Sequence, residues 1–236
     1  MDRNFARALA LVLKSEGGWS DNPADPGGAT MKGVTLASFR RYVKAGATKA
    51  DLRAISDAQV ATVYRRFYWD AVLGAELPDG VDHAVFDFAV NSGPGRAAKY
   101  LQAAVGVAQD GRIGPVTVAA AKAKPAGVTI DALCDARLAF LKRLPTWATF
   151  GRGWSDRVRS VRVQALLMSA QRSAAPVTAA APPRVETSAN GAPSVRLEQP
   201  TPGGKTAAVA GILVLMAGAL AAVRYQIADF FGSLFR

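Results

Sequence analysis

Apolar side chains recur at helical spacing through most of the first 172 residues. Phe5, Leu9 and Val12 share one face of a predicted helix over residues 4–16. Residues 81–92 are rich in β-branched and aromatic side chains, but the spacing of their apolar positions favours a buried helix over a strand. The same periodicity predicts further helices at 36–45, 56–69, 95–105, 130–144 and 155–171. The sequence is therefore predicted to be mainly α.

The pattern changes after residue 172. Residues 173–204 hold six of the thirteen prolines, many Ala, Ser and Thr residues, and no periodic apolar stripe, which is typical of a linker. Residues 206–223 are uncharged and would form a helix about 27 Å long, which predicts a single transmembrane span. The final segment, 224–236, has an apolar side typical of an interfacial helix.

The densest cluster of candidate chemistry lies between Glu16 and Thr35, in the run EGGWSDNPADPGGATMKGVT. Stepping along the apolar stripe of the first helix places Glu16 at its last position, before two glycines end it. A carboxyl group among apolar side chains keeps its proton to higher pH, as a general acid requires. Asp21 and Asp25 follow in a loop rich in glycine and proline that can fold back toward the helix end.

This block resembles the opening of the glycoside hydrolase family 108 muramidases, in which EGG[YW] is followed by N[DP]xDxGGxT and G[VI]T. The order Glu16, Asp25, Thr30 also resembles the Glu–Asp–Thr arrangement of phage-type lysozymes, although the gap from Asp25 to Thr30 is one residue shorter here. The resemblance covers residues 4 to about 170. It implies a lysozyme-like helical catalytic domain at 1–93 with Glu16 as the acid.

A second likeness extends the first. The turn DGRIGPVT at 110–117 resembles one found in small helical modules that bind peptidoglycan, so residues 94–172 are predicted to be such a part packed on the catalytic domain. The resemblance implies Asp25 and Thr30 as partners of Glu16, with Asp21 as the alternative second carboxylate. Candidate sugar contacts are Trp19, Asp21, Tyr64, Tyr68, Trp69 and Asn91.

The net charge of +11 is concentrated in one segment, because residues 137–172 hold eight Lys/Arg against one acidic residue, Asp156. Such a segment suits an anionic wall polymer or membrane surface. The sequence shows no nucleic-acid motif, so no nucleic-acid partner is expected. One cysteine, Cys134, excludes an intramolecular disulfide and is predicted to be buried, and the lone His83 makes a zinc site improbable. No metal or organic cofactor is expected.

Together these features predict a peptidoglycan hydrolase, an N-acetylmuramidase, held at the cytoplasmic (inner) membrane by its C-terminal helix. Two alternatives remain: a wall-binding anchor without catalysis, and a lytic transglycosylase. The start of the chain lacks the apolar region of a secretory signal peptide, so a holin or secretion machinery is a possible partner that would give access to the wall. Resemblance to phage-type lysozymes favours inversion at the anomeric carbon.

Overall fold

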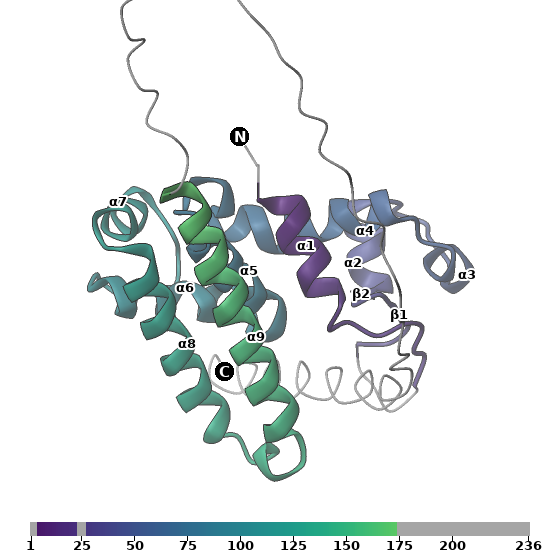
Figure 1. Ribbon diagram of the computed structural model, residues 1–236. Helices are drawn as coiled ribbons and strands as arrows, with labels where there is room; N and C mark the ends of the chain where they lie inside the picture. The colour runs from purple at the N-terminus through teal and green to yellow at the C-terminus, as the bar shows by residue number, and fades with distance from the viewer. Residues whose placement is uncertain (1–3, 23–26, 174–236) are drawn as a thin grey trace, which may run out of the picture.

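Helix α5 (Val81–Ser92) lies at the centre of the protein, and every one of its residues is buried. The computed structural model describes residues 4–22 and 27–173. Within them α5 packs against α1, α6, α8 and α9 (Figure 1). The prediction of a buried helix rather than a strand at 81–92 is confirmed, and a helix buried on all sides explains why its apolar residues do not form a single stripe.

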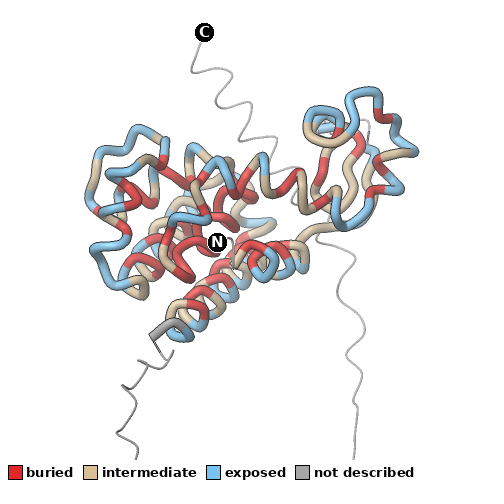
Figure 2. Tube along the Cα trace, turned by 90° about the horizontal axis from the view of Figure 1, so that it is seen from above, coloured by how far each residue is buried: buried red, intermediate tan, exposed pale blue. Residues whose placement is uncertain are grey.

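The C-terminal half of the described chain consists of four helices, three of which pack against α5, while α7 packs against α6 and α8. They are α6 (Pro94–Val105), α7 (Pro115–Ala123), α8 (Ala126–Lys142) and α9 (Trp147–Ser173). Figure 1 shows α8 and α9 as a long antiparallel pair. In Figure 2 the last helix before the grey C-terminal trace, α9, has one buried side and one exposed side, as expected for an amphipathic helix.

Helix α9 meets the start of α5 at close range through Gly80. A Cβ atom on Gly80 would stand 2.1 Å from the carbonyl oxygen of Ala165 in α9, and the φ of Gly80 is +85°. Both the left-handed backbone and the contact require glycine here. This contact fixes how α9 lies across the N-terminal end of α5.

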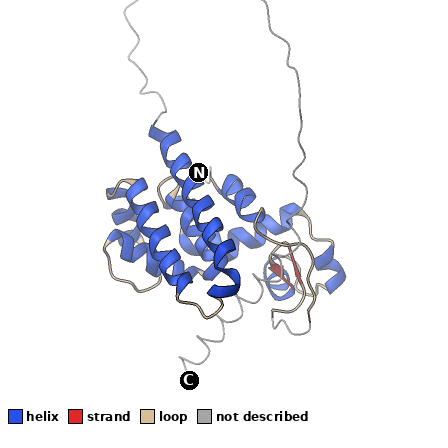
Figure 3. Cartoon of the chain, turned by 60° about the horizontal axis from the view of Figure 1, so that its bottom comes forward, coloured by secondary structure: helices blue, strands red, loops and turns tan. Residues whose placement is uncertain are grey.

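The N-terminal half is built from shorter elements (Figure 3). Helix α1 (Phe5–Leu13) is followed by a two-stranded antiparallel hairpin, β1 (Thr30–Met31) and β2 (Val34–Thr35). The chain continues through α2 (Leu36–Tyr42), α3 (Lys49–Arg53), α4 (Asp57–Tyr64), the π-helical turn η1 (Arg65–Trp69), and two 3₁₀ turns, η2 (Asp70–Val72) and η3 (Gly74–Glu76). The aromatic rings of Phe5, Trp69 and Phe86 pack edge to face between this half and α5.

The sequence predicted which helices form better than it predicted where they begin and end. Helix α1 ends at Leu13, so the predicted end at residue 16 is wrong, and α9 begins eight residues before the predicted start at residue 155. Ser56 caps α4 as predicted, in a reciprocal pair of hydrogen bonds with Gln59. The hairpin and α3 were not predicted. Burial of Cys134 is confirmed, and it raises the pKa of the thiol to about 11.

Several predicted features lie outside the described residues: Asp25, all but the first residue of the linker at 173–204, the transmembrane helix at 206–223 and the tail at 224–236. In the part of the chain that the structure does describe, no helix is both long enough and apolar enough to cross a membrane. The division of the globular part at residue 93 stays a prediction.

Candidate active site

Glu16 lies in the turn that follows α1. The backbone N–H groups of Ser15 and Glu16 donate to the carbonyl oxygens of Val12 and Leu13, at 2.9 and 3.2 Å, so the chain keeps turning for one step beyond the helix. The Glu16 side chain is directed inward and is only 3 % exposed. The sequence therefore predicted its burial correctly, but the position is a turn and not the last helical residue.

Two elements close around the Glu16 carboxyl group. Gly33, between the two strands of the hairpin, comes so close that a Cβ atom there would lie 2.7 Å from Glu16 Oε2 and 2.2 Å from the Tyr64 hydroxyl oxygen. That hydroxyl donates to the carbonyl oxygen of Lys32 at 3.0 Å, which ties α4 to the hairpin. Gly33 has a φ of +74°, so its glycine serves both the turn and the close approach.

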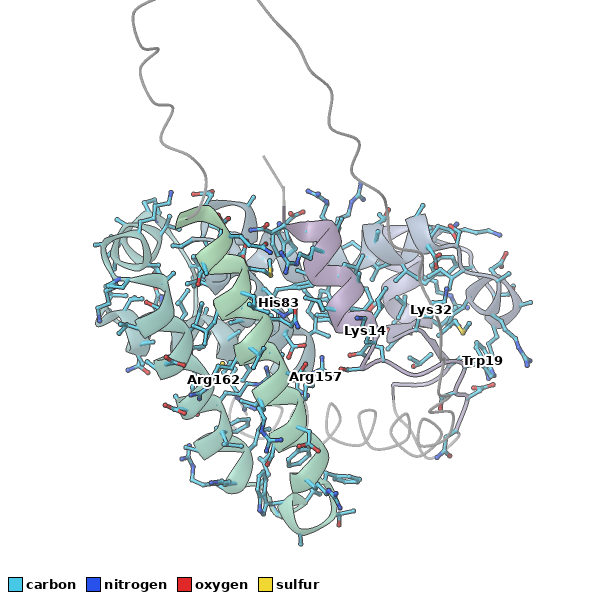
Figure 4. All side chains as sticks on the ribbon, in the orientation of Figure 1. Lys14, Trp19, Lys32, His83, Arg157 and Arg162 are labelled. Atoms are coloured by element: carbon cyan, nitrogen blue, oxygen red, sulfur yellow. The ribbon has the colours of Figure 1, made fainter. Side chains whose placement is uncertain are left out.

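Arg157, from α9, approaches Glu16 from the other side. Its two terminal nitrogens lie 3.4 and 3.5 Å from Glu16 Oε1. The same guanidinium group binds Asp87 of α5 more closely, with contacts of 2.9 to 3.2 Å to both carboxylate oxygens. Figure 4 shows Arg157 on the side of α9 that faces α1, near Lys14, whereas Arg162 is directed toward α8.

Asp87 is in turn held by a second arginine. Arg137 of α8 donates to Asp87 Oδ1 at 2.7 Å, and both side chains are almost completely buried. Burial alone would raise the pKa of Asp87, but the guanidinium groups of Arg157 and Arg137 outweigh it and hold that pKa below its ordinary value. The three side chains thus form a buried, ionised cluster directly behind Glu16.

A groove of about 740 Å³ borders Glu16 across Gly33. Its volume is within the range of ligand-binding pockets. Residues of the hairpin, η1, α5, α6 and the turn at 110–112 line it. Glu16 itself is not among the lining residues; its carboxyl group lies beside Gly33, which is one of them. The lining includes Gly33, Thr35, Ser38, Phe67, Tyr68, Asn91, Arg96, Lys99, Tyr100, Asp110 and Arg112.

Residues 110–112, the first part of the turn at 110–117, line this groove. The Gln102 side chain in α6 donates to Asp110, to the carbonyl oxygen of Arg112 and to Thr117, and it accepts from the backbone N–H of Gly111. The backbone N–H of Arg112 and the Gln102 amide lower the pKa of Asp110. The turn is therefore fixed to α6, and Pro115 begins α7 as the sequence predicted.

The predicted partners of Glu16 have different surroundings. Asp21 forms an ion pair with Lys49 at 3.0 Å and is about one-third exposed. Thr30 lies in β1, where its hydroxyl donates to the carbonyl oxygen of Gly28 at 3.1 Å. Asp25 lies between the described residues 22 and 27, outside the structure, so its role stays a prediction.

The predicted sugar contacts separate into groove and core residues. Tyr68 and Asn91 both line the groove and are mostly buried. Trp69 and Tyr64 are buried in the core, with 1 % and 0 % of their surfaces exposed. Trp19 is partly buried and stacks with the guanidinium group of Arg53, whose carbon lies 5.3 Å from its ring centre. The groove therefore brings together Tyr68 and Asn91 but not the two tryptophans.

Comparison with known proteins identifies the family. The family model described as Glycosyl hydrolase 108 matches residues 9–93. A solved structure, that of Brucella abortus SagA, is 48 % identical, with a TM-score of 0.64, and the match covers 72 % of this chain and 97 % of that one. The chain belongs to the glycosyl hydrolase 108 family. This makes it a glycoside hydrolase of the lysozyme-like, peptidoglycan-degrading type. No curated protein matches the chain.

The family 108 match includes Glu16 and Asp87 but ends before Arg137 and Arg157. The likeness of the turn at 110–117 to peptidoglycan-binding modules therefore stays a prediction.

The sequence analysis did not predict that two arginines, Arg137 and Arg157, are buried; it placed them in a basic segment suited to an anionic surface. A signal was present: Arg157 is three residues after Trp154 and four before Val161, and Arg137 stands midway between Leu133 and Leu141. Each arginine thus falls on an apolar stripe, where a charge requires a buried partner.

Proposed function

We propose that the chain is an N-acetylmuramidase, which hydrolyses the β-1,4 bond between N-acetylmuramic acid and N-acetylglucosamine in peptidoglycan. The observation that carries this proposal is the buried Glu16 carboxyl group, which is held between the hairpin and α9. It lies beside Gly33, and Gly33 lines the groove of about 740 Å³. A carboxyl group fixed in this way can deliver a proton to a glycosidic oxygen bound in the groove.

In the proposed reaction Glu16 gives its proton to the leaving oxygen as the bond to the anomeric carbon breaks. A water molecule attacks that carbon, loses its proton to a second carboxylate, and restores a neutral sugar hydroxyl. Asp25 is the proposed second carboxylate, with Thr30 beside it and Asp21 as the alternative. The engagement of Asp21 with Lys49 favours Asp25 for this role. Direct attack by water would invert the anomeric carbon.

The lining of the groove fits an amphipathic and anionic substrate. Tyr68 and Tyr100 offer aromatic faces for sugar rings, and Asn91 offers an amide for an acetamido group. The charged residues that line the groove are three cations, Arg96, Lys99 and Arg112, and one anion, Asp110, so its lining is net positive. Peptidoglycan carries peptides with free carboxylates on its muramic acid residues, and these would be attracted to the cationic wall of the groove.

Mass spectrometry of digested peptidoglycan tests this proposal directly. Products with reducing muramic acid ends are expected from a muramidase. Products with 1,6-anhydro ends would instead establish a lytic transglycosylase, and failure to release any product at all would favour a wall-binding anchor.

We also propose that the full-length protein is held at the cytoplasmic membrane by residues 206–223, with a holin or secretion machinery giving the catalytic part access to the wall. The apolar, uncharged character of that segment supports the proposal. Full-length protein should fractionate with membranes and require detergent, whereas a variant ending at residue 173 should not. Recovery of full-length protein without detergent would contradict the anchor.

A further inference from the structure

The guanidinium group of Arg157 joins two carboxyl groups that come from different parts of the chain. Its Nε and one terminal nitrogen bind both oxygens of Asp87, and its terminal nitrogens also lie 3.4 and 3.5 Å from Glu16 Oε1. The Arg157 side chain is 8 % exposed, and the two carboxylates are 3 % exposed. This is a buried link between α9, α5 and the turn after α1.

The orientation of Arg157 is fixed by its stronger partner. A planar guanidinium group bound to both oxygens of a carboxylate has little rotational freedom left. Asp87 is itself fixed, because Arg137 binds it at 2.7 Å from α8. Two buried ion pairs, Arg157–Asp87 and Arg137–Asp87, therefore hold the guanidinium group that faces Glu16. The packing of α5, α8 and α9 in turn holds these ion pairs.

We infer that Arg157 is a positioning residue for Glu16, and that Asp87 and Arg137 hold Arg157 in place for this purpose. The inference rests on the proposed role of Glu16 as the acid. It also means that α8 and α9, which lie beyond the part of the chain matched by the family model, complete the active site.

The distances suggest how such an arrangement serves proton transfer. Arg157 lies closer to Asp87, at 2.9 Å, than to Glu16, at 3.4 Å. Asp87 also binds Arg137, so the two arginines and the one aspartate keep one net positive charge beside Glu16. Glu16 is neutral before it gives up its proton and negative afterwards. A cation already in place beside it stabilises the negative charge that develops on Glu16 as the glycosidic bond breaks, with no reorganisation needed.

Steady-state kinetics of Arg157→Met and Arg157→Lys on a short soluble glycan test the inference. We expect Arg157→Met to lower kcat at least about tenfold with little change in KM, because misplacing a catalytic group by about 1 Å can cost as much as about 100-fold. Arg157→Lys keeps the charge but loses the planar group that binds both oxygens of Asp87, so its kcat should lie between those of wild type and Arg157→Met. All assays are run well below the melting temperature of each variant, so that the folded fraction is the same.

Arg159→Met is the matched control. Arg159 is two residues further along the same helix, its side chain is 73 % exposed, and it forms an ion pair with the exposed Asp156. We expect the control to keep the wild-type kcat and KM. If Arg157→Met does not fold, Arg157→Gln, which keeps a hydrogen-bond donor without the charge, takes its place in the comparison.

The same substitution in a Glu16→Gln background separates positioning from a general structural role. If Arg157 acts through Glu16, Arg157→Met should lower the residual kcat of Glu16→Gln by less than about twofold, because residues that act as a unit are non-additive. An equal loss in both backgrounds, or wild-type kcat in folded Arg157→Met, would overturn the inference. If Glu16→Gln itself keeps wild-type activity, the proposed acid is wrong, and that result is distinct from either outcome.

Discussion

Arg157 and Glu16 are 141 positions apart in the sequence, yet their side chains lie 3.4 Å from each other and both are buried. Glu16 comes from the turn after the first helix and Arg157 from the last described helix. The carboxyl group proposed as the catalytic acid is therefore held by both ends of the described chain. A family match that stops at residue 93 contains the acid but not the residue beside it.

Glu16→Gln should abolish hydrolysis while the protein stays folded. The amide keeps the shape of the side chain but has no proton to transfer, so we expect kcat to fall at least about 100-fold. Turnover of purified peptidoglycan measures the effect, and thermal unfolding verifies the fold. Clearing of peptidoglycan at a rate near wild type would exclude Glu16 as the acid.

Asp25→Asn should impair turnover strongly, and Asp21→Asn should impair it less. Asp21 is engaged with Lys49 on a partly exposed surface, so its loss removes an ion pair of small worth. Parallel assays of the two variants, each compared with Glu16→Gln, rank the two carboxylates. The reverse ranking would transfer the second catalytic role to Asp21.

Gly33→Ala should reduce activity by displacing the Glu16 carboxyl group. The new methyl group would meet Glu16 Oε2 at 2.7 Å and the Tyr64 hydroxyl at 2.2 Å, and something must move. Gly106→Ala is the matched control, because Gly106 also has a positive φ, +81°, but a Cβ atom there would only be in ordinary contact with Lys124 Nζ, at 3.9 Å. Both variants should lose roughly 1–2 kcal/mol of stability from backbone strain at a positive φ, but only Gly33→Ala should also have a lower kcat. Equal kcat in the two variants would show that the hairpin does not control the acid.

Lys99→Met and Arg112→Met should weaken binding of peptide-bearing glycan. Both side chains are exposed at the groove, where each interaction with a carboxylate is worth up to about 1 kcal/mol, so KM should rise as much as about fivefold with kcat unchanged. Glycan stripped of its peptides should be cleaved by both variants as by wild type. Lys122→Met, on the exposed side of α7, controls for loss of a surface charge. An equal rise of KM on both substrates would argue against recognition of the peptide carboxylates.

Asp87→Asn should destabilise the protein at neutral pH. Two buried arginines would lose their shared anion, and breaking a buried pair in this way typically costs about 3–5 kcal/mol of unfolding free energy. Asp156→Asn, in an exposed pair on α9, should change the unfolding free energy by less than about 1 kcal/mol. Denaturant unfolding of both variants at pH 7 makes the comparison.

The contribution of Asp87 to the unfolding free energy should also depend on pH. The pKa of Asp87 is lowered in the folded state, so its contribution to stability is fully present above the unfolded value, near 4, and is lost as pH falls below that value. Wild-type unfolding free energy should therefore drop more steeply than that of Asp87→Asn between about pH 4 and pH 2. If the unfolding free energies of the two proteins fell in parallel with pH, the two arginines would not be stabilising the ionised form of Asp87.

Local signals accounted for most of the helices, whereas the contacts that complete the site are set by distant residues. Ser56 and Gln59 form a capping box within four residues, so the start of α4 could be predicted. Gly151 and Gly153 disfavour a helix, but Trp147 folds over Gly151, where a Cβ atom would stand 2.6 Å from the ring. Packing of this kind extends α9 to residue 147, and local propensity gives no sign of it.

The site shows the same division. Burial of the Glu16 side chain could be predicted from the apolar stripe of the first helix, but the arginine beside it could not. Arg157 is one of eight cations in a basic run, and its acidic partner, Asp87, is 70 residues earlier in the chain. Only the fold brings the two together. The apolar neighbours of Arg157 along α9 indicate that it is buried, but they do not say which anion it binds.

The structure also changes how the basic segment at 137–172 should be tested. Arg157 and Arg137 are buried in ion pairs, and Arg162 pairs with Asp131 and Asp135 of α8, so reversing these charges would disturb the fold. Arg159 is exposed further along α9, and three exposed cations, Lys142, Arg143 and Arg152, lie around the turn between α8 and α9 at the lower end of the pair in Figure 1. These are the side chains that an anionic wall polymer or lipid surface could reach.

Charge reversal of Lys142, Arg143 and Arg152 to glutamate should lower activity on whole peptidoglycan and leave cleavage of a short soluble glycan unchanged. Exposed charges are screened within about 8 Å at physiological ionic strength, so rising salt should reduce wild-type activity on the polymer in the same way. The triple variant should already be insensitive to salt. A soluble glycan without peptides should be cleaved at similar rates at low and high salt, because it has no peptide carboxylates for Lys99 and Arg112 to bind and the Glu16 and Arg157 side chains are shielded from solvent. Equal salt sensitivity on the two substrates would show that the turn between α8 and α9 is an ordinary solvated surface that does not bind the wall.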